Sequence, residues 1–294
     1  MKNKKYILTL HKLIFVLPCL ILFTVFFTYP NIMSFYYSLL KWDGIGKPVF
    51  VGLDNFKRVL SGSDKAAITS LFNTFKFALL NMIIQNPLSL LLAVLLVRPL
   101  KSKAILRTIF YIPGVVSLVA VSVTFSVIMG YNGVFNSVLK VFGQGGNLVD
   151  WLGNYHTAFY ALVVIIVWGG LGGGAIIYIA GLQSIPNELY EAGYMEGINE
   201  WQKFWNITLP LLMPSVTIVT FLGLSQTLKM FDMPFVLTGG GPGNQTRTMS
   251  MYIYNKFSEN DRGYSTALGL VFLVIIIIVV GLQMKLTRKR EVDL

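Results

Sequence analysis

Apolar residues in this chain are gathered into long uninterrupted runs instead of being spaced at helical or strand intervals. A helix needs about twenty residues to cross a bilayer, and six runs reach that length. They lie near residues 13–36, 73–97, 107–130, 156–182, 210–230 and 265–285. The runs lack period-two alternation, and only helices or closed barrels satisfy backbone polar groups in lipid. The pattern therefore predicts an all-α polytopic membrane protein with six transmembrane helices.

The first run follows a basic stretch, residues 1–5, that resembles the start of a secretory signal peptide. The apolar segment is too long for such a peptide, and no small-residue cleavage site follows it. We interpret this run as an uncleaved first transmembrane helix.

Basic residues between the runs predict the orientation of the chain, because cytoplasmic segments of membrane proteins carry an excess of Lys and Arg. Lys and Arg are denser in segments 1–12, 98–107, 183–210 and 285–294 than in segments 40–72, 131–155 and 231–266. The first set is therefore expected inside. Both termini are then cytoplasmic, and so is the polar segment 183–210.

Composition agrees with a membrane protein. Hydrophobic residues make up 54% of the chain and charged residues 13%, whereas soluble domains carry about 25% charged residues. The net charge of +11 comes from basic residues at the ends of the apolar runs. That placement fits anionic lipid headgroups better than nucleic acid. Cys19 is the single cysteine, which excludes a disulfide within the chain, and a buried, inert thiol is expected there.

The residues needed for several kinds of chemistry are missing. The fragment Gly44–Pro48 lacks the first glycine and the Ser or Thr of a phosphate-binding P-loop. The only histidines are His11 and His156, and no Cys/His cluster could hold a metal. No catalytic residues are predicted. The runs also contain almost no ionisable groups, which disfavours an ion-coupled secondary carrier and favours an external source of energy.

Small and polar residues inside the runs are the remaining candidates for a binding site. One interpretation is helix packing, since small residues allow close approach and amides bond across helices. The other is an uncharged polar path near the membrane midplane, which suits sugars because their hydroxyl groups need hydrogen bonds. The candidate path residues are Trp168, Gly170, Gly173, Gly223, Gln226, Thr227 and Met230, with Asn81 and Gln85 as further candidates.

The polar segment between the fourth and fifth runs is unusually acidic for a cytoplasmic loop, which suggests a docking surface. Its acidic residues are Glu188, Glu191, Glu196 and Glu200, against the single lysine Lys203.

The same segment has the signals of a short helix. Pro186 and Asn187 precede Glu188, which predicts a start with an Asn cap and an acid in the first turn. We expect a helix over about 187–199, with Gly197 letting the chain turn out of it. A break is also expected at Pro113 and Gly114, at the start of the third transmembrane helix; it is either a simple kink or a gate.

Four motifs together resemble a known family. They are Gly52–Phe56, Arg107–Pro113, the segment Glu191-Ala192-Gly193 with Gly197 and Ile207–Pro210, and Leu237–Gly243. The third resembles the "EAA" loop by which permeases of ABC importers grip their ATPase. Over roughly residues 50–285 the chain resembles binding-protein-dependent ABC importer permeases of the maltose/glycerol-phosphate/lactose-type group. It departs at Gly193, where the family has alanine, and at Glu196–Ile198, where the family has Asp-Gly-Ala.

The resemblance implies a type I importer transmembrane fold and a transport subunit without enzymatic activity. Implied partners are a second, different permease, two ATPase subunits, an extracytoplasmic solute-binding protein and membrane lipid. ATP and Mg²⁺ would bind to the ATPase, and no cofactor or metal to this chain. The implied location is the bacterial cytoplasmic membrane. The implied coupling residues, within loop 183–210, are Glu188, Glu191, Ala192, Gly193, Glu196 and Gly197.

The expected organisation has three parts. Residues 1–70 hold the N-terminal tail, first helix and first outer loop, residues 71–285 the transmembrane domain, and residues 286–294 a basic tail. The expected substrate is a di- or oligosaccharide. Alternatives are an ABC permease for glycerol phosphodiester or polyamine, a secondary carrier, and a membrane scaffold or intramembrane enzyme.

Overall fold

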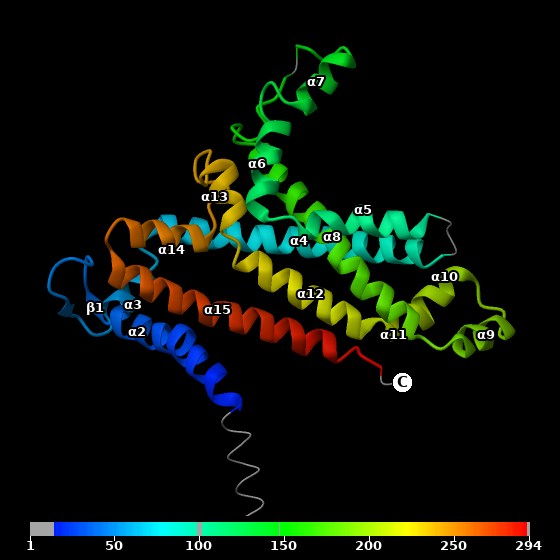
Figure 1. Cartoon of the computed structure of the whole chain (residues 1–294), viewed down its shortest axis with the longest axis horizontal. Coiled ribbons are helices and arrows are strands. Elements are labelled where there is room, and N and C mark those ends of the chain that lie inside the picture. Colours follow the sequence, from blue (N-terminus) through cyan, green and yellow to red (C-terminus); the bar gives the residue numbers. More distant parts are fainter. Residues whose placement is uncertain (1–14, 99–101, 147, 293–294) are drawn as a thin grey trace, which may run out of the picture. The chain divides into compact units, whose positions relative to one another are not determined.

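Helices dominate the computed structural model, which describes residues 15–98, 102–146 and 148–292 (Figure 1). Two short strands, β1 (Leu40–Lys41) and β2 (Val49–Phe50), pair antiparallel. The helices, with η marking π-helical turns, are η1 (Thr24–Thr28), α2 (Tyr29–Ser38), α3 (Asp54–Leu60), α4 (Lys65–Val97), α5 (Lys103–Val115), α6 (Leu118–Ile128), α7 (Val134–Val141), α8 (Ala158–Ser184), α9 (Asn187–Met195), α10 (Glu200–Lys203), η2 (Phe204–Thr208), α11 (Leu209–Leu211), α12 (Met213–Leu228), α13 (Asp232–Thr238), α14 (Met249–Ser258) and α15 (Arg262–Arg288).

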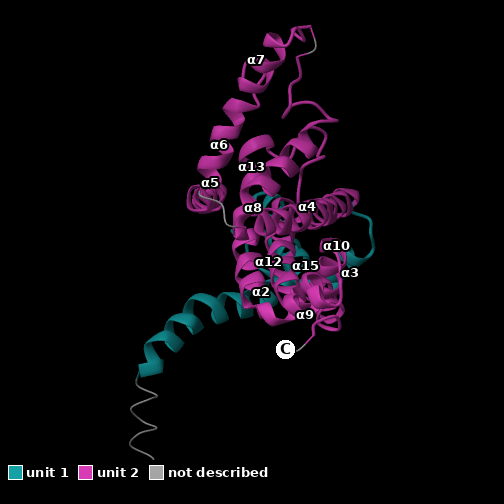
Figure 2. Ribbon diagram, turned by 90° about the vertical axis from the view of Figure 1, so that its right-hand side faces the viewer, with its two compact units in different colours: residues 1–64, 253–273 teal, residues 65–252, 274–294 magenta. Residues whose placement is uncertain are grey.

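The described residues form two compact units, coloured separately in Figure 2. Unit 1 combines the described part of residues 1–64 with 253–273. Unit 2 combines the described parts of 65–252 and 274–294. The acidic loop 183–210 and the candidate path residues all lie in unit 2. The candidate site is therefore described within this unit.

The number of helices able to span a membrane agrees with the predicted pattern, but two predicted spans are not continuous. Four helices are long and apolar enough by themselves: Phe15–Ser38, Lys65–Val97, Ala158–Ser184 and Arg262–Arg288. Two further spans exist only as bent pairs. Lys103–Val115 and Leu118–Ile128 meet at 100°, and Glu200–Leu211 and Met213–Leu228 meet at 66°.

The bend between α5 and α6 lies later than predicted. Pro113 is accommodated inside the last turns of α5, and the chain leaves the helix at Val116, whose backbone is extended. Ser117 then starts α6, because its side chain accepts a hydrogen bond from the amide of Ala120 at 3.2 Å. The expectation of a break at the start of this helix is therefore wrong in its position. Proline weakens the helix, and the serine cap fixes where the new direction begins.

The first span, Phe15–Ser38, is exposed along most of its length. None of its most apolar window is buried within the chain, and Cys19 is exposed as well. The expected burial of this thiol is therefore wrong, because the helix turns no face toward the rest of unit 1 at that level.

Unit 2 is built on α4, α8 and α12, which pack against one another. Phe77 and Phe159 stack at the centre of its core, with ring centroids 4.2 Å apart. Small residues bring the helices close: a Cβ added to Gly174 would lie 2.7 Å from the hydroxyl of Ser89. Ser89 in turn donates to the carbonyl oxygen of Leu171 at 3.1 Å. Helix packing thus explains Gly174, one of the glycines of the fourth apolar run.

Unit 1 is held together by polar contacts within its first segment and between its two segments. The buried amide of Asn55 donates to the carbonyl oxygens of Ser38 and Leu40 at 2.8 and 2.9 Å. Arg58 pairs with Asp261 at 2.8 Å. These contacts tie α3 to the strands and to the start of α15.

Candidate functional site

The acidic loop forms two short helices joined at a left-handed glycine. Helix α9 ends at Met195, earlier than the predicted end near 199, and Gly197 has φ +77°. The amide of Ile198 donates to the carbonyl of Gly193 at 3.2 Å, and that of Gly197 to the carbonyl of Tyr194 at 3.0 Å. This pair of bonds is the Schellman arrangement that closes a helix. The expected turn at Gly197 is therefore confirmed, and it also explains why the helix is shorter.

The predicted Asn cap is wrong for α9. Asn187 lies inside the helix, and the cap position belongs to Pro186, whose side chain makes no capping bond. The proline already holds the φ with which the chain enters the helix. The asparagine cap occurs instead at Asn199, whose side-chain Oδ1 accepts from the backbone amide of Gln202 at 2.9 Å. The backbone amide of Asn199 donates to Oε1 of the Gln202 side chain at 3.0 Å. This reciprocal pair is a capping box that starts α10.

Most of the candidate coupling residues lie on the surface of the loop. Glu188, Glu191, Ala192, Glu196 and Gly197 are exposed, whereas Gly193 is buried. A Cβ on Gly193 would lie 2.6 Å from Ile198 Cδ1 and 2.9 Å from Ile207 Cδ1. Gly193 is therefore a packing position, and the exposed residues are the ones able to touch a partner.

Met195 is a surface residue that the sequence analysis did not select. Its side chain is 89% exposed at the end of α9. An exposed methionine next to the acidic residues adapts easily to an apolar cleft. In the sequence, Met195 could have been recognised as an apolar residue directly before Glu196.

A second region of interest is a cavity of about 450 Å³ inside unit 2. Six helices contribute to it: α4, the end of α5 with the following bend, α6, α8, the end of α12, and the start of α13 with the connection that precedes it. Its lining residues are Asn81, Gln85, Pro113, Gly114, Val116, Leu118, Val121, Ile165, Ile166, Gly169, Gly170, Gln226, Thr227, Lys229, Met230, Phe231, Asp232 and Met233.

Amide and hydroxyl groups in this cavity are linked by hydrogen bonds. Asn81 Nδ2 donates to Thr227 Oγ1 at 3.0 Å, and Thr227 Oγ1 donates to the carbonyl of Gly223 at 2.8 Å. Gln85 Nε2 donates to the carbonyl of Gly170 at 3.1 Å. Asn81 is 4% exposed, and its Oδ1 has no hydrogen-bond partner. An unpaired buried acceptor is costly, so a hydroxyl donor entering the cavity would stabilise it.

The structure brings together six of the nine predicted path residues. The six that line the cavity are Asn81, Gln85, Gly170, Gln226, Thr227 and Met230. Trp168 does not line it and instead packs edge-to-face on Phe125, with centroids 5.2 Å apart. Gly173 and Gly223 are also outside the lining. A Cβ at Gly173 would meet open space, and one at Gly223 would lie 3.6 Å from Asn81 Nδ2.

Two charged residues at the cavity were missed. Lys229 ends α12 and Asp232 begins α13, and both line the cavity and are exposed. The prediction of a path without any charge nearby is therefore wrong at this end. A lysine followed three residues later by an aspartate was visible in the sequence, but only the turn between the helices aims both at one space.

Metal binding finds no support in the part of the chain that the structure describes. Among residues 15–98, 102–146 and 148–292, no group of three or more His, Cys, Asp or Glu side chains is placed to hold an ion.

Comparison with known proteins shows the family to which the chain is related. Residues 4–292 match the family described as "Binding-protein-dependent transport system inner membrane component". The chain is similar to a probable starch degradation products transport system permease protein of Thermoanaerobacterium thermosulfurigenes, with 34% identity over 96% of this chain and 95% of that protein. It is equally similar to a multiple sugar-binding transport system permease protein of Streptococcus mutans serotype c, with 34% identity over 95% of each.

The fold has a counterpart among solved structures. A bacterial ABC transporter involved in the import of the acidic polysaccharide alginate contains a chain with TM-score 0.82 and 24% identity, covering 98% of both chains. At this identity the likeness concerns the fold alone.

Proposed function

The chain belongs to the family of inner membrane components of binding-protein-dependent transport systems, and we propose that it is one permease subunit of an ATP-driven importer for a di- or oligosaccharide. Two relatives named for starch degradation products and for multiple sugars support a sugar as the substrate. Both are similar along nearly the whole chain, so the comparison includes the cavity and the acidic loop.

The observation that carries this proposal is the cavity of about 450 Å³ with amides and a hydroxyl from two helices. Asn81, Gln85, Gln226 and Thr227 offer both donors and acceptors, which match the hydroxyl groups of a sugar. The unpaired Oδ1 of Asn81 is available to one of those hydroxyls. Phe231 also lines the cavity, and its ring stacks on that of Phe235 with centroids 4.9 Å apart.

Energy would come from outside the chain. Two ATPase subunits would bind ATP and Mg²⁺, a second and different permease would form the other half of the path, and an extracytoplasmic binding protein would deliver the sugar. This chain itself would bind no cofactor. Closure of the ATPases would move α9 with its exposed residues Glu188, Glu191, Ala192, Glu196 and Gly197, and the helices would rock between two states.

The orientation that follows from the basic residues belongs to this proposal. Both termini would lie on the cytoplasmic side of a bacterial cell membrane, and α9 and α10 would face the ATPases there. Residues 71–285 would act as the transport domain, preceded by 1–70 and followed by the basic tail 286–294.

A second candidate substrate class is favoured by Lys229 and Asp232. A cation and an anion at the rim of the cavity could hold a glycerol phosphodiester through the lysine or a polyamine through the aspartate. This alternative keeps the same ATP-driven importer and changes only the transported solute.

Uptake into proteoliposomes tests the proposal. The complete transporter would be reconstituted with its binding protein on one side and ATP on the other. Labelled oligosaccharide should enter only with ATP, and a protonophore should leave the rate unchanged. Uptake that collapses with the protonophore would establish a secondary carrier instead. Uptake of a phosphodiester or polyamine but of no sugar would establish the alternative substrate class.

A further inference from the structure

The motif Leu237–Gly243 is one of the family signatures, and the proposed function gives it no role. In the structure it leads from the end of α13 into residues 239–248, which connect this helix to α14. Gly240 is buried with φ +87°, and a Cβ there would lie 3.1 Å from Cβ of Arg247. Glycine permits this close return of the chain. We name residues 239–248 the return loop.

Hydrogen bonds around a buried threonine hold the return loop in shape. Thr246 is fully buried, and its Oγ1 donates to the carbonyl of Gly241 at 2.7 Å. The same Oγ1 lies 2.6 Å from Oγ1 of Thr238, and the amide of Thr246 donates to the carbonyl of Gly240 at 3.3 Å. A buried polar group that loses its partner is costly. These bonds therefore favour one conformation of the loop.

The return loop is fastened to the long helix α4. Asn73 Nδ2 donates to the carbonyls of Asn244 and Arg247 at 2.8 and 3.3 Å. Directly after the loop, the amide of Met249 donates to Oγ1 of Thr74 at 2.8 Å. Asn73 and Thr74 are both buried. The position of the loop is therefore set by two neighbouring side chains of α4.

Thr248, the last residue of the return loop, bonds the wall of the cavity. Thr248 is fully buried, and its Oγ1 donates to the carbonyl of Met230 at 2.8 Å. Met230 lines the cavity and lies in the connection between α12 and α13. Because this connection is not helical, its buried carbonyls need partners from elsewhere in the chain. Thr248 supplies that partner for Met230.

The same wall is bonded directly from α4. Asn81 Nδ2 donates to Thr227 Oγ1 at 3.0 Å, and the amide of Met230 donates to the carbonyl of Thr227 at 3.2 Å. Asn81 follows Thr74 by two helical turns on one face of α4, about 10 Å along its axis. The α12–α13 wall is thus tied to α4 at two levels, once through Asn81 and once through Thr74 and Thr248.

From these contacts we propose that Thr248 is a positioning residue for transport through the cavity. Its bond to Met230 holds the α12–α13 wall at a fixed distance from α4, so that Gln226 on one side and Asn81 on the other can bind the same solute. A group displaced by about 1 Å loses much of its contribution. This inference rests on the proposed function and adds to it a residue that does not line the cavity but sets its width.

The mobility of a spin label on the wall tests the tie without any solute. Asp232 begins α13, lines the cavity and is exposed. In the complete transporter, with Cys19→Ser and no other cysteine, a nitroxide is attached to Asp232→Cys. Thr248→Val removes the hydroxyl and keeps the shape of the side chain. It should shorten the rotational correlation time of the label at least about twofold, because a wall that has lost one tie opens more often. Thr248→Ser should restore the slower motion.

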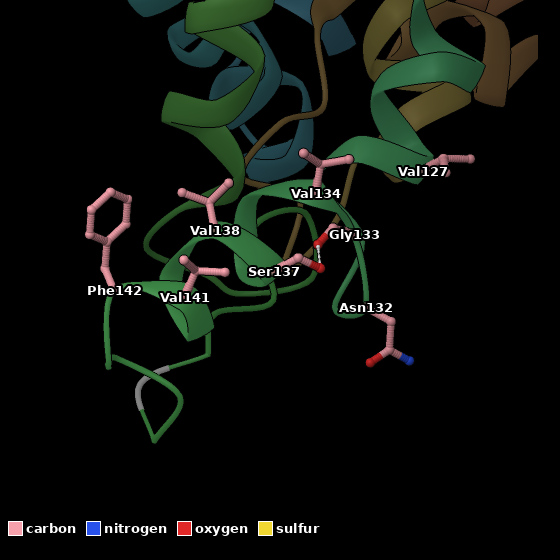
Figure 3. A pocket seen from close by; sticks show the side chains of 8 residues that line it. All are labelled: Val127, Asn132, Gly133, Val134, Ser137, Val138, Val141 and Phe142. Atoms are coloured by element: carbon pink, nitrogen blue, oxygen red, sulfur yellow. Dashed lines mark hydrogen bonds between the residues drawn. The ribbon is translucent and has the colours of Figure 1, made fainter.

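Two controls separate this effect from general loosening of the chain. Val141 lies in a separate hollow formed by α7 and the end of α6 (Figure 3), and no residue of the return loop lines that hollow. A label on Val141→Cys should keep its mobility in every variant. Ser122→Ala is the matched control variant, because Ser122 is also fully buried and its hydroxyl donates to the carbonyl of Leu118 in its own helix at 2.7 Å. It should leave the label at Asp232→Cys unchanged.

Uptake provides the functional measurement. Thr248→Val should lower the maximal rate of ATP-dependent uptake about 10-fold, because displaced binding groups lose much of their contribution, while basal ATPase activity and the yield of assembled transporter stay unchanged. Thr248→Ser should recover most of the rate. If Thr248→Val does not assemble, Thr74→Val, which removes the acceptor for the Met249 amide, should raise the mobility of the label in the same direction.

The possible results distinguish this proposal from the proposed substrate. Unchanged label mobility in Thr248→Val and Thr74→Val would overturn the positioning role, whatever the transporter carries. A fall in uptake that only follows a fall in assembled transporter would overturn it as well. Increased mobility and slower uptake of a phosphodiester or polyamine, in a transporter that imports no sugar, would support the positioning role and count against the sugar alone.

Discussion

Gly193 and Ile198 fit together so closely that a Cβ on the glycine would lie 2.6 Å from Cδ1 of the isoleucine. These are two of the positions at which the loop departs from the EAA-loop pattern that it resembles, which has alanine at both. The lost methyl at one position makes room for the larger side chain at the other. The same two residues share a backbone hydrogen bond of 3.2 Å, so the pair also closes helix α9.

The first prediction concerns this pair. Gly193→Ala should destabilise the loop by about 1–3 kcal/mol, because overpacking forces neighbours to move. Ile198→Ala in the same chain should recover most of that loss, since it removes the side chain that the new methyl meets. Thermal unfolding of the purified transporter and co-purification of the ATPase measure both effects. If the double variant is no better than the sum of the single ones, the two residues are not coupled.

Gly197 should tolerate asparagine better than alanine. Its φ of +77° costs a residue with a Cβ about 1–2 kcal/mol, and asparagine adopts this region more readily than alanine. Gly197→Ala should therefore reduce ATPase co-purification more than Gly197→Asn, and Gly197→Trp should detach or uncouple the ATPase while the chain still inserts. Normal stoichiometry and normal uptake in the Trp variant would show that this loop does not couple the ATPase.

Gln226 should contribute to sugar transport and Gly173 should not. Gln226→Ala removes a cavity-lining amide, and one hydrogen bond is worth about 0.5–1.5 kcal/mol, so uptake should fall roughly 2- to 10-fold with basal ATPase activity preserved. Gly173→Ala is the control, because Gly173 does not line the cavity and its new methyl group would meet nothing within 4 Å. Equal uptake by both variants would leave Gln226 with a packing role.

Variants of Pro113 and Ser117 distinguish between a simple kink and a gate at the α5–α6 bend. Pro113→Ala should leave the bend in place, because Ser117 still caps α6, and uptake should stay near normal. Ser117→Ala should cost about 1 kcal/mol of stability through loss of that cap. A strong loss of uptake in Pro113→Ala at unchanged stability would indicate that the proline itself takes part in gating.

The orientation of the chain can be checked by cysteine labelling. In a Cys19→Ser background, Ser102→Cys should react with an impermeant maleimide only from the cytoplasmic side and Gly145→Cys only from outside, since basic residues flank the α4–α5 connection. Labelling of Gly145→Cys from inside alone would reverse the proposed topology.

The sequence by itself determined the elements and the two regions of interest. Hydropathy is a property of single segments, so the runs predicted the spans, and the short-range spacing of Pro186, Glu188 and Gly197 predicted a helix that ends in a turn. The four motifs identified the family. The coupling roles given to the residues of the acidic loop rest on that resemblance.

Only the tertiary structure decided where the spans bend and which polar groups meet. The hydrogen bond between Asn81 and Thr227 joins positions 146 residues apart, and Lys229 reaches the cavity only because the chain turns between α12 and α13. The selection of cavity residues over Trp168 and Gly173 depends on how each helix is rotated about its axis. That rotation is set by packing between distant helices, such as α4 against α8 and α12, and in a uniformly apolar helix the sequence carries no periodic signal that could fix it.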